Sequence, residues 1–217
     1  MLERISKREL FDLTVAWLAI SIAFAIIFAK GGSGELFVQT SLVTFLMFLG
    51  ISLVTVGIGF ILHEMAHKFT AIHYGYHSEF RKNDVMLVIA ILLAALVGFV
   101  FAAPGATLIY GQTTREQSGK ISAMGPLTNL ILCIPFAAIF LGSRLIGGAE
   151  FGQVLALVGF VGLNVNAMIA AFNMLPISVL DGKKVLSWNA GIFAILIIAA
   201  FGILLGLYYP SLFSMGL

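Results

Sequence analysis

The chain has 217 residues, of which 60% are apolar and only 10% are charged, and its mean hydropathy is +1.08. Soluble domains carry about 25% charged residues, so this composition excludes a separate soluble domain and predicts one membrane-embedded domain over residues 1–217. The net charge of +2 is scattered over short loops and indicates no nucleic-acid partner, and the single cysteine, Cys133, excludes an internal disulfide.

Six long stretches without Asp, Glu, Lys or Arg follow one another along the chain. A helix that crosses a bilayer needs about 20 largely apolar residues, and most of these stretches are long enough. We therefore expect an all-α polytopic membrane protein with five to six transmembrane helices, joined by loops that include 75–84, 111–120 and 181–184. The basic N-terminus is followed by a poor cleavage site, which favours an uncleaved first helix. The stretches are 13–29, 36–62, 85–114, 121–143, 151–180 and 185–217.

The second stretch ends in three residues that can form a metal site. On a helix, residues four apart lie about 40° apart around the axis, so His63 and His67 can bind one metal ion. Glu64 can then take a proton from a water at that ion. Ionisable groups within a membrane are costly and tend to mark function. The pattern predicts a zinc hydrolase site that operates within the bilayer.

The third stretch, 85–114, can cross the membrane or enter and return on the same side. If it crosses, seven basic residues lie inside and five outside; if it returns, ten lie inside and two outside, which obeys the positive-inside rule far better. The second arrangement puts the N-terminus and the active-site end on the cytoplasmic side of the cell membrane, and a sixth spanning helix remains the alternative. The inside set is Arg4, Lys7, Arg8, Lys68, Arg81, Lys82, Arg115, Lys120, Lys183 and Lys184, against Lys30 and Arg144.

The length of the third stretch allows this re-entrant path. A helix over 85–98 would rise about 21 Å, and an extended segment over 103–111 would return about 30 Å. The Ala-Ala-Pro-Gly sequence at 102–105 supplies the reversal, and residues 107–110 have strand character. Extended backbone at membrane depth is tolerated only where protein or a wet cavity surrounds it. We therefore expect a short re-entrant β element near the active site.

A third metal ligand is needed, because catalytic zinc usually takes three protein ligands and keeps one position open. Asp181 is the only acidic residue between Phe151 and the C-terminus, and the favoured arrangement brings it to the same side of the membrane as His63. A solvated aspartate before a glycine in a turn is the plainer interpretation. The shared depth favours Asp181 as the third ligand.

Four further polar or small residues lie on that same side. Gly125 allows two helices to approach closely, and Asn129 can form a hydrogen bond across their interface. Asn166 and Asn173, seven residues apart, share one face of a helix. An amide at this depth can donate to the oxyanion of a tetrahedral intermediate or orient the attacking water. Ordinary helix packing and interhelical hydrogen bonds remain the competing explanation for all four.

The order His-Glu-x-x-His, Gly-Pro-x-x-Asn and Asn-x-x-Pro-x-x-x-x-Asp-Gly resembles the site-2 protease family of intramembrane zinc metalloproteases, peptidase family M50. The resemblance implies a catalytic core at about 41–184 with one zinc ion per chain, a transmembrane protein substrate and a bilayer-embedded strand. No PDZ or CBS domain, which many members carry, is expected here. The resemblance also implies that His63, His67 and Asp181 bind zinc and that Glu64 is the general base. By the same resemblance, Asn173 would assist at the scissile carbonyl, and Gly125 and Asn129 would shape the catalytic core.

Other functions remain open at this stage. A membrane metal-ion transporter or binding protein could use the same two histidines and aspartate, but it would be expected to carry further acidic residues within its spans, and the uncharged stretches hold none. A membrane zinc peptidase with a glutamate as third ligand is less consistent, because no glutamate follows Glu150. A catalytically inactive relative is disfavoured by the intact Glu64.

Overall fold

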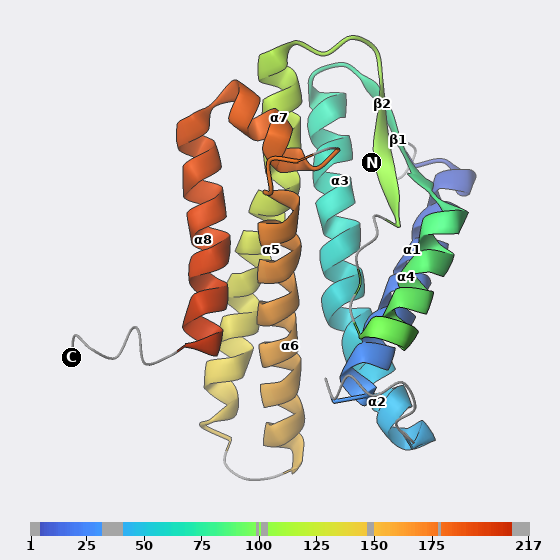
Figure 1. The fold of residues 1–217 in the computed structure, drawn as a ribbon, viewed down its shortest axis with the longest axis vertical. Helices are drawn as coiled ribbons and strands as arrows, with labels where there is room; N and C mark the ends of the chain where they lie inside the picture. The colour runs from blue at the N-terminus through green and yellow to red at the C-terminus, as the bar shows by residue number, and fades with distance from the viewer. Residues whose placement is uncertain are drawn as a thin grey trace, which may run out of the picture.

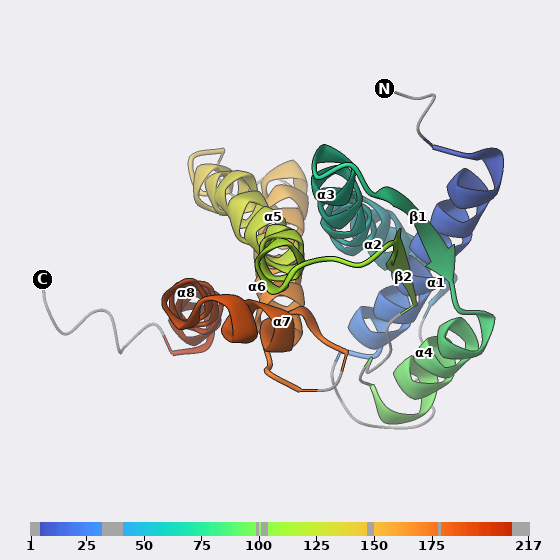
Figure 2. The same cartoon turned by 90° about the horizontal axis from the view of Figure 1, so that it is seen from above.

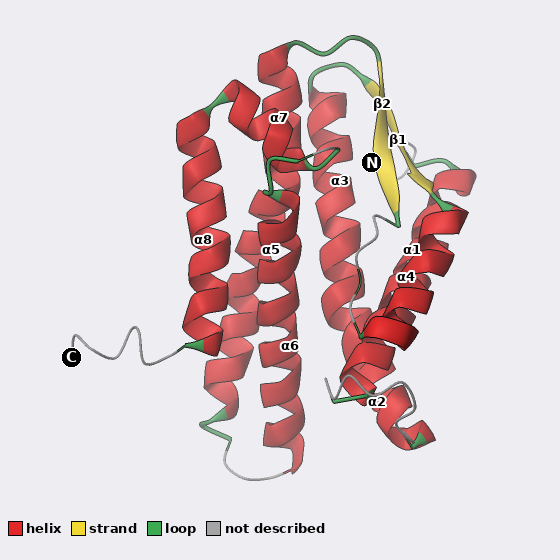
Figure 3. Ribbon diagram, viewed as in Figure 1, coloured by secondary structure: helices red, strands yellow, loops and turns green. Residues whose placement is uncertain are grey.

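The fold was examined in a computed structural model, which describes residues 5–31, 41–98, 100, 104–146, 150–177 and 179–209. Helices dominate the described part of the chain, and one small sheet accompanies them (Figure 1, Figure 3). The elements are α1 (Lys7–Ala29), α2 (Leu42–Ser52), the π-helical turn η2 (Leu53–Gly57), α3 (Ile58–His73), β1 (His77–Lys82), α4 (Asp84–Val97), β2 (Gly105–Tyr110), α5 (Arg115–Ser143), α6 (Glu150–Asn173), α7 (Asp181–Trp188) and α8 (Ala190–Tyr208).

Within the described residues, five helices are long and apolar enough to cross a membrane. They are α1, the continuous helix Leu42–His73 formed by α2, η2 and α3, and the helices α5, α6 and α8. α4 has only 14 residues and rises about 21 Å, which is short of the roughly 30 Å hydrocarbon core of a bilayer. The expectation of an all-α membrane protein with five to six such helices and a small β element is confirmed.

The third apolar stretch does enter and return. α4 descends from the end of the molecule that holds the sheet, and β2 climbs back to that end (Figure 1). Gly98, with a φ of 73°, ends α4 in the left-handed conformation that glycine adopts without strain. Of the expected reversal at 102–105, residues 102 and 103 lie outside the described residues. The alternative of a sixth spanning helix over 85–114 is therefore wrong.

β2 pairs with a strand that the sequence did not predict. Residues 75–84 were expected to form a loop, but His77–Lys82 is strand β1, antiparallel to β2 in a register that runs from His77 opposite Tyr110 to Lys82 opposite Gly105. The sequence does not predict β1 as a strand because its composition is polar. Of its six side chains, only those of Ser78 and Phe80 are buried. The expected re-entrant strand, β2, is thus one strand of an antiparallel pair, and α4 connects its two strands along the chain.

Two other expected loops are partly helical. α5 begins at Arg115, where Thr114 and Gln117 form a reciprocal capping box, so the loop expected at 111–120 belongs to this helix from residue 115 onwards. The loop expected at 181–184 is the first turn of α7, which begins at Asp181. The Asp181 side chain is therefore held by a helix.

The helices form two groups on either side of α3 (Figure 2). α5, α6, α7 and α8 pack on one side, and α1, α4 and the sheet lie on the other. α5 and α6 approach closely because Gly159 leaves room for the backbone of Phe140 and Gly162 for the ring of Phe136. The start of α1, the end of α3, the sheet, the start of α5 and α7 share one end of the molecule, the upper end in Figure 1. This is the arrangement that the ten-against-two charge count favours.

Candidate metal centre and active site

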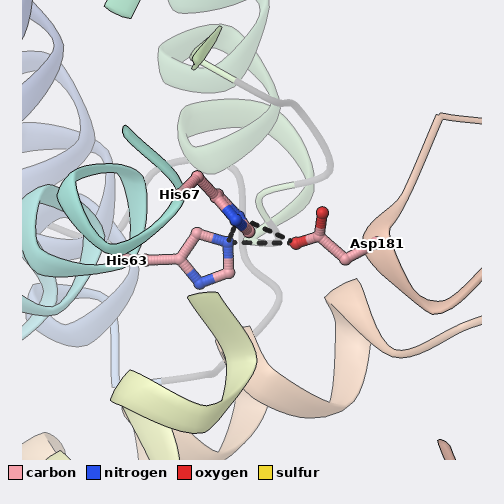
Figure 4. A group of neighbouring side chains, drawn as sticks. All are labelled: His63, His67 and Asp181. Atoms are coloured by element: carbon pink, nitrogen blue, oxygen red, sulfur yellow. Dashed lines mark hydrogen bonds and ion pairs between the residues drawn. The ribbon is translucent and has the colours of Figure 1, made fainter. Parts of the chain in front are cut away.

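Three ligand atoms from two distant segments meet near that end of the molecule (Figure 4). His63 and His67 lie one turn apart on α3, with their Nε2 atoms 3.0 Å apart. Asp181 Oδ2, from the start of α7, lies 3.3 Å from His63 Nε2 and 3.1 Å from His67 Nε2. All three side chains are buried. They are close enough to bind one metal ion, as the sequence predicted.

Hydrogen bonds fix how both imidazoles face this centre. His63 Nδ1 lies 2.6 Å from Asn129 Oδ1, and His67 Nδ1 lies 2.8 Å from the carbonyl oxygen of Ile121. Because both partners are acceptors, each Nδ1 carries the ring proton and donates. Each Nε2 therefore keeps its lone pair and turns it towards Asp181, which is how metal-binding histidines are usually oriented.

The predicted supporting residue Asn129 is itself held by a chain of amides. Its Nδ2 donates to the carbonyl oxygen of Gly59, at 3.2 Å, and to Asn166 Oδ1, at 2.9 Å. Asn166 Nδ2 in turn donates to the carbonyl oxygen of Gly162 at 2.8 Å. Both amides are buried, and these bonds leave only Asn129 Oδ1 directed at His63. Asn166 thus acts on the centre through Asn129 and does not share a site with Asn173.

The two glycines of the sequence motifs are required by space. A Cβ at Gly125 would lie 2.6 Å from His63 Nε2 and closer still to His67 Nε2, so any side chain there would displace the ligand atoms. A Cβ at Gly182 would run into the backbone carbonyl of Met174. Gly182 therefore allows the start of α7, and with it Asp181, to settle against the end of α6.

Glu64 points to the re-entrant strand. Its Oε2 accepts hydrogen bonds from the Thr107 backbone N–H at 3.0 Å and from Thr107 Oγ1 at 2.8 Å, while Thr107 Oγ1 also lies 3.1 Å from the Glu64 carbonyl oxygen. Both of these hydrogen-bond donors are neutral groups. Sequence reasoning missed this role of Thr107. The only available signal was a hydroxyl in an otherwise apolar strand.

A cavity of about 140 Å³ opens beside the centre, between α3, α6 and the start of β2. Asn173 contributes to its wall and donates from Nδ2 to the carbonyl oxygen of Ile169, at 3.0 Å, in its own helix. Asn173 therefore lines the same space as His63 and Glu64. The remaining wall is mainly apolar, with Phe60, Pro104, Gly105 and Phe172 among its members.

Comparisons with known proteins agree with this geometry. The model of peptidase family M50 matches residues 51–147, which contain both histidines and Asn129. A protein of Methanocaldococcus jannaschii, provisionally named a zinc metalloprotease, is 38% identical over 203 residues, covering 93% of this chain and 95% of that protein. The chain belongs to peptidase family M50.

A second relative is more distant. It is the protein Rip2 of Mycolicibacterium smegmatis, also provisionally named a zinc metalloprotease, which is 32% identical over 136 residues, covering 56% of this chain and 50% of that protein. No solved structure matches the chain significantly. The site-2 protease resemblance of the sequence is confirmed at the level of the M50 family, and a metalloprotease activity follows from it.

The donor set fits the zinc ion expected of an M50 metalloprotease. Two imidazole nitrogens and one carboxylate oxygen form a common ligand set for catalytic zinc, one that leaves a fourth position open. Asp181 Oδ2 faces the Nε2 atoms of both histidines, and it is as a carboxylate that an aspartate binds a metal.

Proposed function

We propose that this M50 metalloprotease hydrolyses a peptide bond in or near a transmembrane segment of a membrane-protein substrate, as a protease of the site-2 type. The observation that carries the proposal is the position of the ligand pair and Glu64 on α3, which continues an apolar helix of 32 residues, Leu42–His73. A protease whose ligands lie on a membrane-spanning helix acts on segments that enter the membrane.

In the proposed mechanism, His63, His67 and Asp181 hold the zinc ion. When bound, zinc acts as a Lewis acid that polarises the scissile carbonyl and makes a water molecule acidic near neutral pH. Glu64 takes the proton of the attacking water and passes it to the leaving amine. Asn173, on the wall of the same cavity, donates from its amide to the oxygen on which negative charge develops.

The substrate must unwind before it can react, since an α-helix hides its peptide bonds in internal hydrogen bonds. β2 offers a second backbone to which an unwound segment can bind by strand addition. β1 occupies one edge of β2, and Gly105 at the start of β2 lies on the wall of the cavity. An extended substrate along the other edge would lead its peptide bonds towards Glu64.

The proposed orientation puts the site near the cytoplasmic face. The basic residues at the starts of α1 and α5 and in β1 and α7 share one end of the molecule, and positive residues favour the cytoplasmic side. Water would then reach the cavity from the cytoplasm. The lipid bilayer and a transmembrane protein substrate are the partners implied.

The replacement Glu64→Gln tests the proposal directly. Purified wild type and variant are placed in phospholipid vesicles with a panel of tagged single-span membrane proteins, and both cleavage and zinc content are measured. We expect equal zinc in both proteins and cleavage by the wild type alone, because glutamine cannot take the proton of water. Cleavage by Glu64→Gln at the wild-type rate, or no cleavage of any single-span protein by the wild type, would contradict the proposal.

A further inference from the structure

A buried ion pair outside the metal centre joins three elements. Glu9 of α1 and Lys68 of α3 are both 0% exposed, and their charged groups are in direct contact. The second carboxylate oxygen of Glu9, Oε1, accepts a hydrogen bond of 2.9 Å from the backbone N–H of Phe80 in β1. Glu9 therefore holds both the helix that carries the metal ligands and the sheet beside it. Lys68 directly follows the ligand His67.

The register of the sheet connects this ion pair to the proposed base. Phe80 of β1 lies opposite Thr107 of β2. The N–H of Phe80 points to Glu9, and the N–H of Thr107 points to Glu64, so the two groups leave the sheet at opposite edges. This is the geometry of an antiparallel pair that exchanges no hydrogen bonds of its own. The two-stranded sheet is thus held between two carboxylates, one on α1 and one on α3.

The two carboxylates are held in different ways. Glu9 is paired with a buried cation, whereas the described contacts of Glu64 with the sheet come only from the neutral donors of Thr107. A buried ion pair is often no more stabilising than apolar side chains of the same size. A function in positioning therefore explains better than stability why two charges are buried here.

Resting on the proposed function, we propose that Glu9 is a positioning residue for Glu64. It fixes β1 against α3 through Lys68 and the Phe80 N–H, and β1 in turn sets where Thr107 holds the base. The ring of Phe80 packs edge-on against Phe60 of α3, with centroids 5.8 Å apart, so the strand is also seated on this helix by its side chain. Without the Glu9 acceptor, the sheet shifts relative to α3 and the Glu64 carboxylate is displaced with it.

Two double variants separate the strand contact from the ion pair. Glu9→Gln with Lys68→Met removes both charges but keeps an amide oxygen that can accept from Phe80. Glu9→Leu with Lys68→Met removes the charges and the acceptor together, and neither variant leaves one charge of the pair buried without the other. With a single-span membrane protein as substrate, we expect kcat of the leucine variant to be about tenfold below that of the glutamine variant, at equal zinc content, because small displacements of a base are costly. Equal kcat values would overturn the proposal.

A double-mutant cycle tests whether Glu9 acts through the sheet. Both variants are remade with Thr107→Val, which removes the hydroxyl that holds Glu64. Residues that act through one path are not additive, so the ratio between the glutamine and leucine variants should become clearly smaller than in the Thr107 background. A ratio unchanged by Thr107→Val would mean that Glu9 acts elsewhere, for example on stability alone, and would overturn the proposal.

A fallback variant and two control proteins make the result of this experiment unambiguous. If the leucine variant does not accumulate in the membrane, Glu9→Asp decides, because it keeps the charge for Lys68 but shortens the reach to Phe80 by one methylene; a wild-type kcat would then contradict the proposal. Wild type and Glu64→Gln are assayed alongside. Activity in Glu64→Gln would refute the proposed function itself, whereas a failure of the Glu9 comparison with Glu64→Gln inactive would refute only the role of Glu9.

Discussion

At the scale of single residues, the centre is shaped by side chains that bind no metal. Asn129 and the Ile121 carbonyl take the Nδ1 protons of the two histidines, and Gly125 leaves the space in which both Nε2 atoms lie. All three come from α5, so one helix supports both imidazoles of another. Such outer contacts keep the ligands ready for the metal, because the rings need not turn when it binds.

Gly125→Ala is expected to damage the metal centre without unfolding the protein. The added methyl group would push against both Nε2 atoms, and we expect the affinity for zinc to fall by about 10–100-fold, as for other disturbed contacts around metal ligands. Titration of metal-free protein with zinc measures the change. The matched control is Gly202→Ala in α8, where a Cβ meets nothing within 4 Å. Equal zinc affinity of both variants would show that Gly125 does not shape the centre.

At the scale of elements, the re-entrant α4–β2 segment brings a backbone edge to the catalytic helix. Two contacts from α1 and its C-cap support this region: Glu9 holds β1, the partner strand of β2, and Lys30 donates to the carbonyl oxygen of Ala95 near the end of α4. The contact that reaches the site is the pair of hydrogen bonds from Thr107 to Glu64. The sheet thus lies between a supporting helix and the helix that carries the chemistry.

Thr107→Val should lower kcat by about tenfold and leave zinc content unchanged, because the hydroxyl helps to orient the base while the backbone N–H remains. Thr107→Ser, which restores a hydroxyl, should recover most of the rate. Thr70→Val is the matched control on α3, since the Thr70 hydroxyl bonds only to the Ala66 carbonyl of its own helix. If Thr107→Val and Thr70→Val have the same kcat, Thr107 plays no part in catalysis.

Sequence reasoning found those parts of the site that carry a strong chemical pattern. His63, Glu64 and His67 are recognisable from their spacing, and Asp181 from being the one acidic residue between Phe151 and the C-terminus. Thr107, the Ile121 carbonyl and β1 were missed. Their roles depend on which segments meet in space, and neither a threonine in a strand nor a polar hexapeptide has a periodicity that reveals its partner.

At the scale of the whole molecule, the charge count predicted the path of the chain better than hydrophobicity did. The stretch 85–114 is long and apolar enough to be taken for a spanning helix, yet the chain turns back at the end of α4. The bias in basic residues reveals the turn because it depends on every loop and not on one segment. The same bias predicts which side faces the cytoplasm.

Cysteine labelling in intact cells measures this arrangement. In a Cys133→Ser background, single cysteines replace Ser187 in α7, Arg144 after α5, and Val97 at the end of α4. A membrane-impermeant maleimide added outside should label position 144 and not position 187, because the end of α5 and α7 lie at opposite ends of the molecule (Figure 1). Position 97 should resist the reagent, since α4 rises only about 21 Å and ends within the bilayer. Labelling at 97 as fast as at 144 would mean that this segment crosses the membrane, and labelling at 187 alone would reverse the predicted orientation.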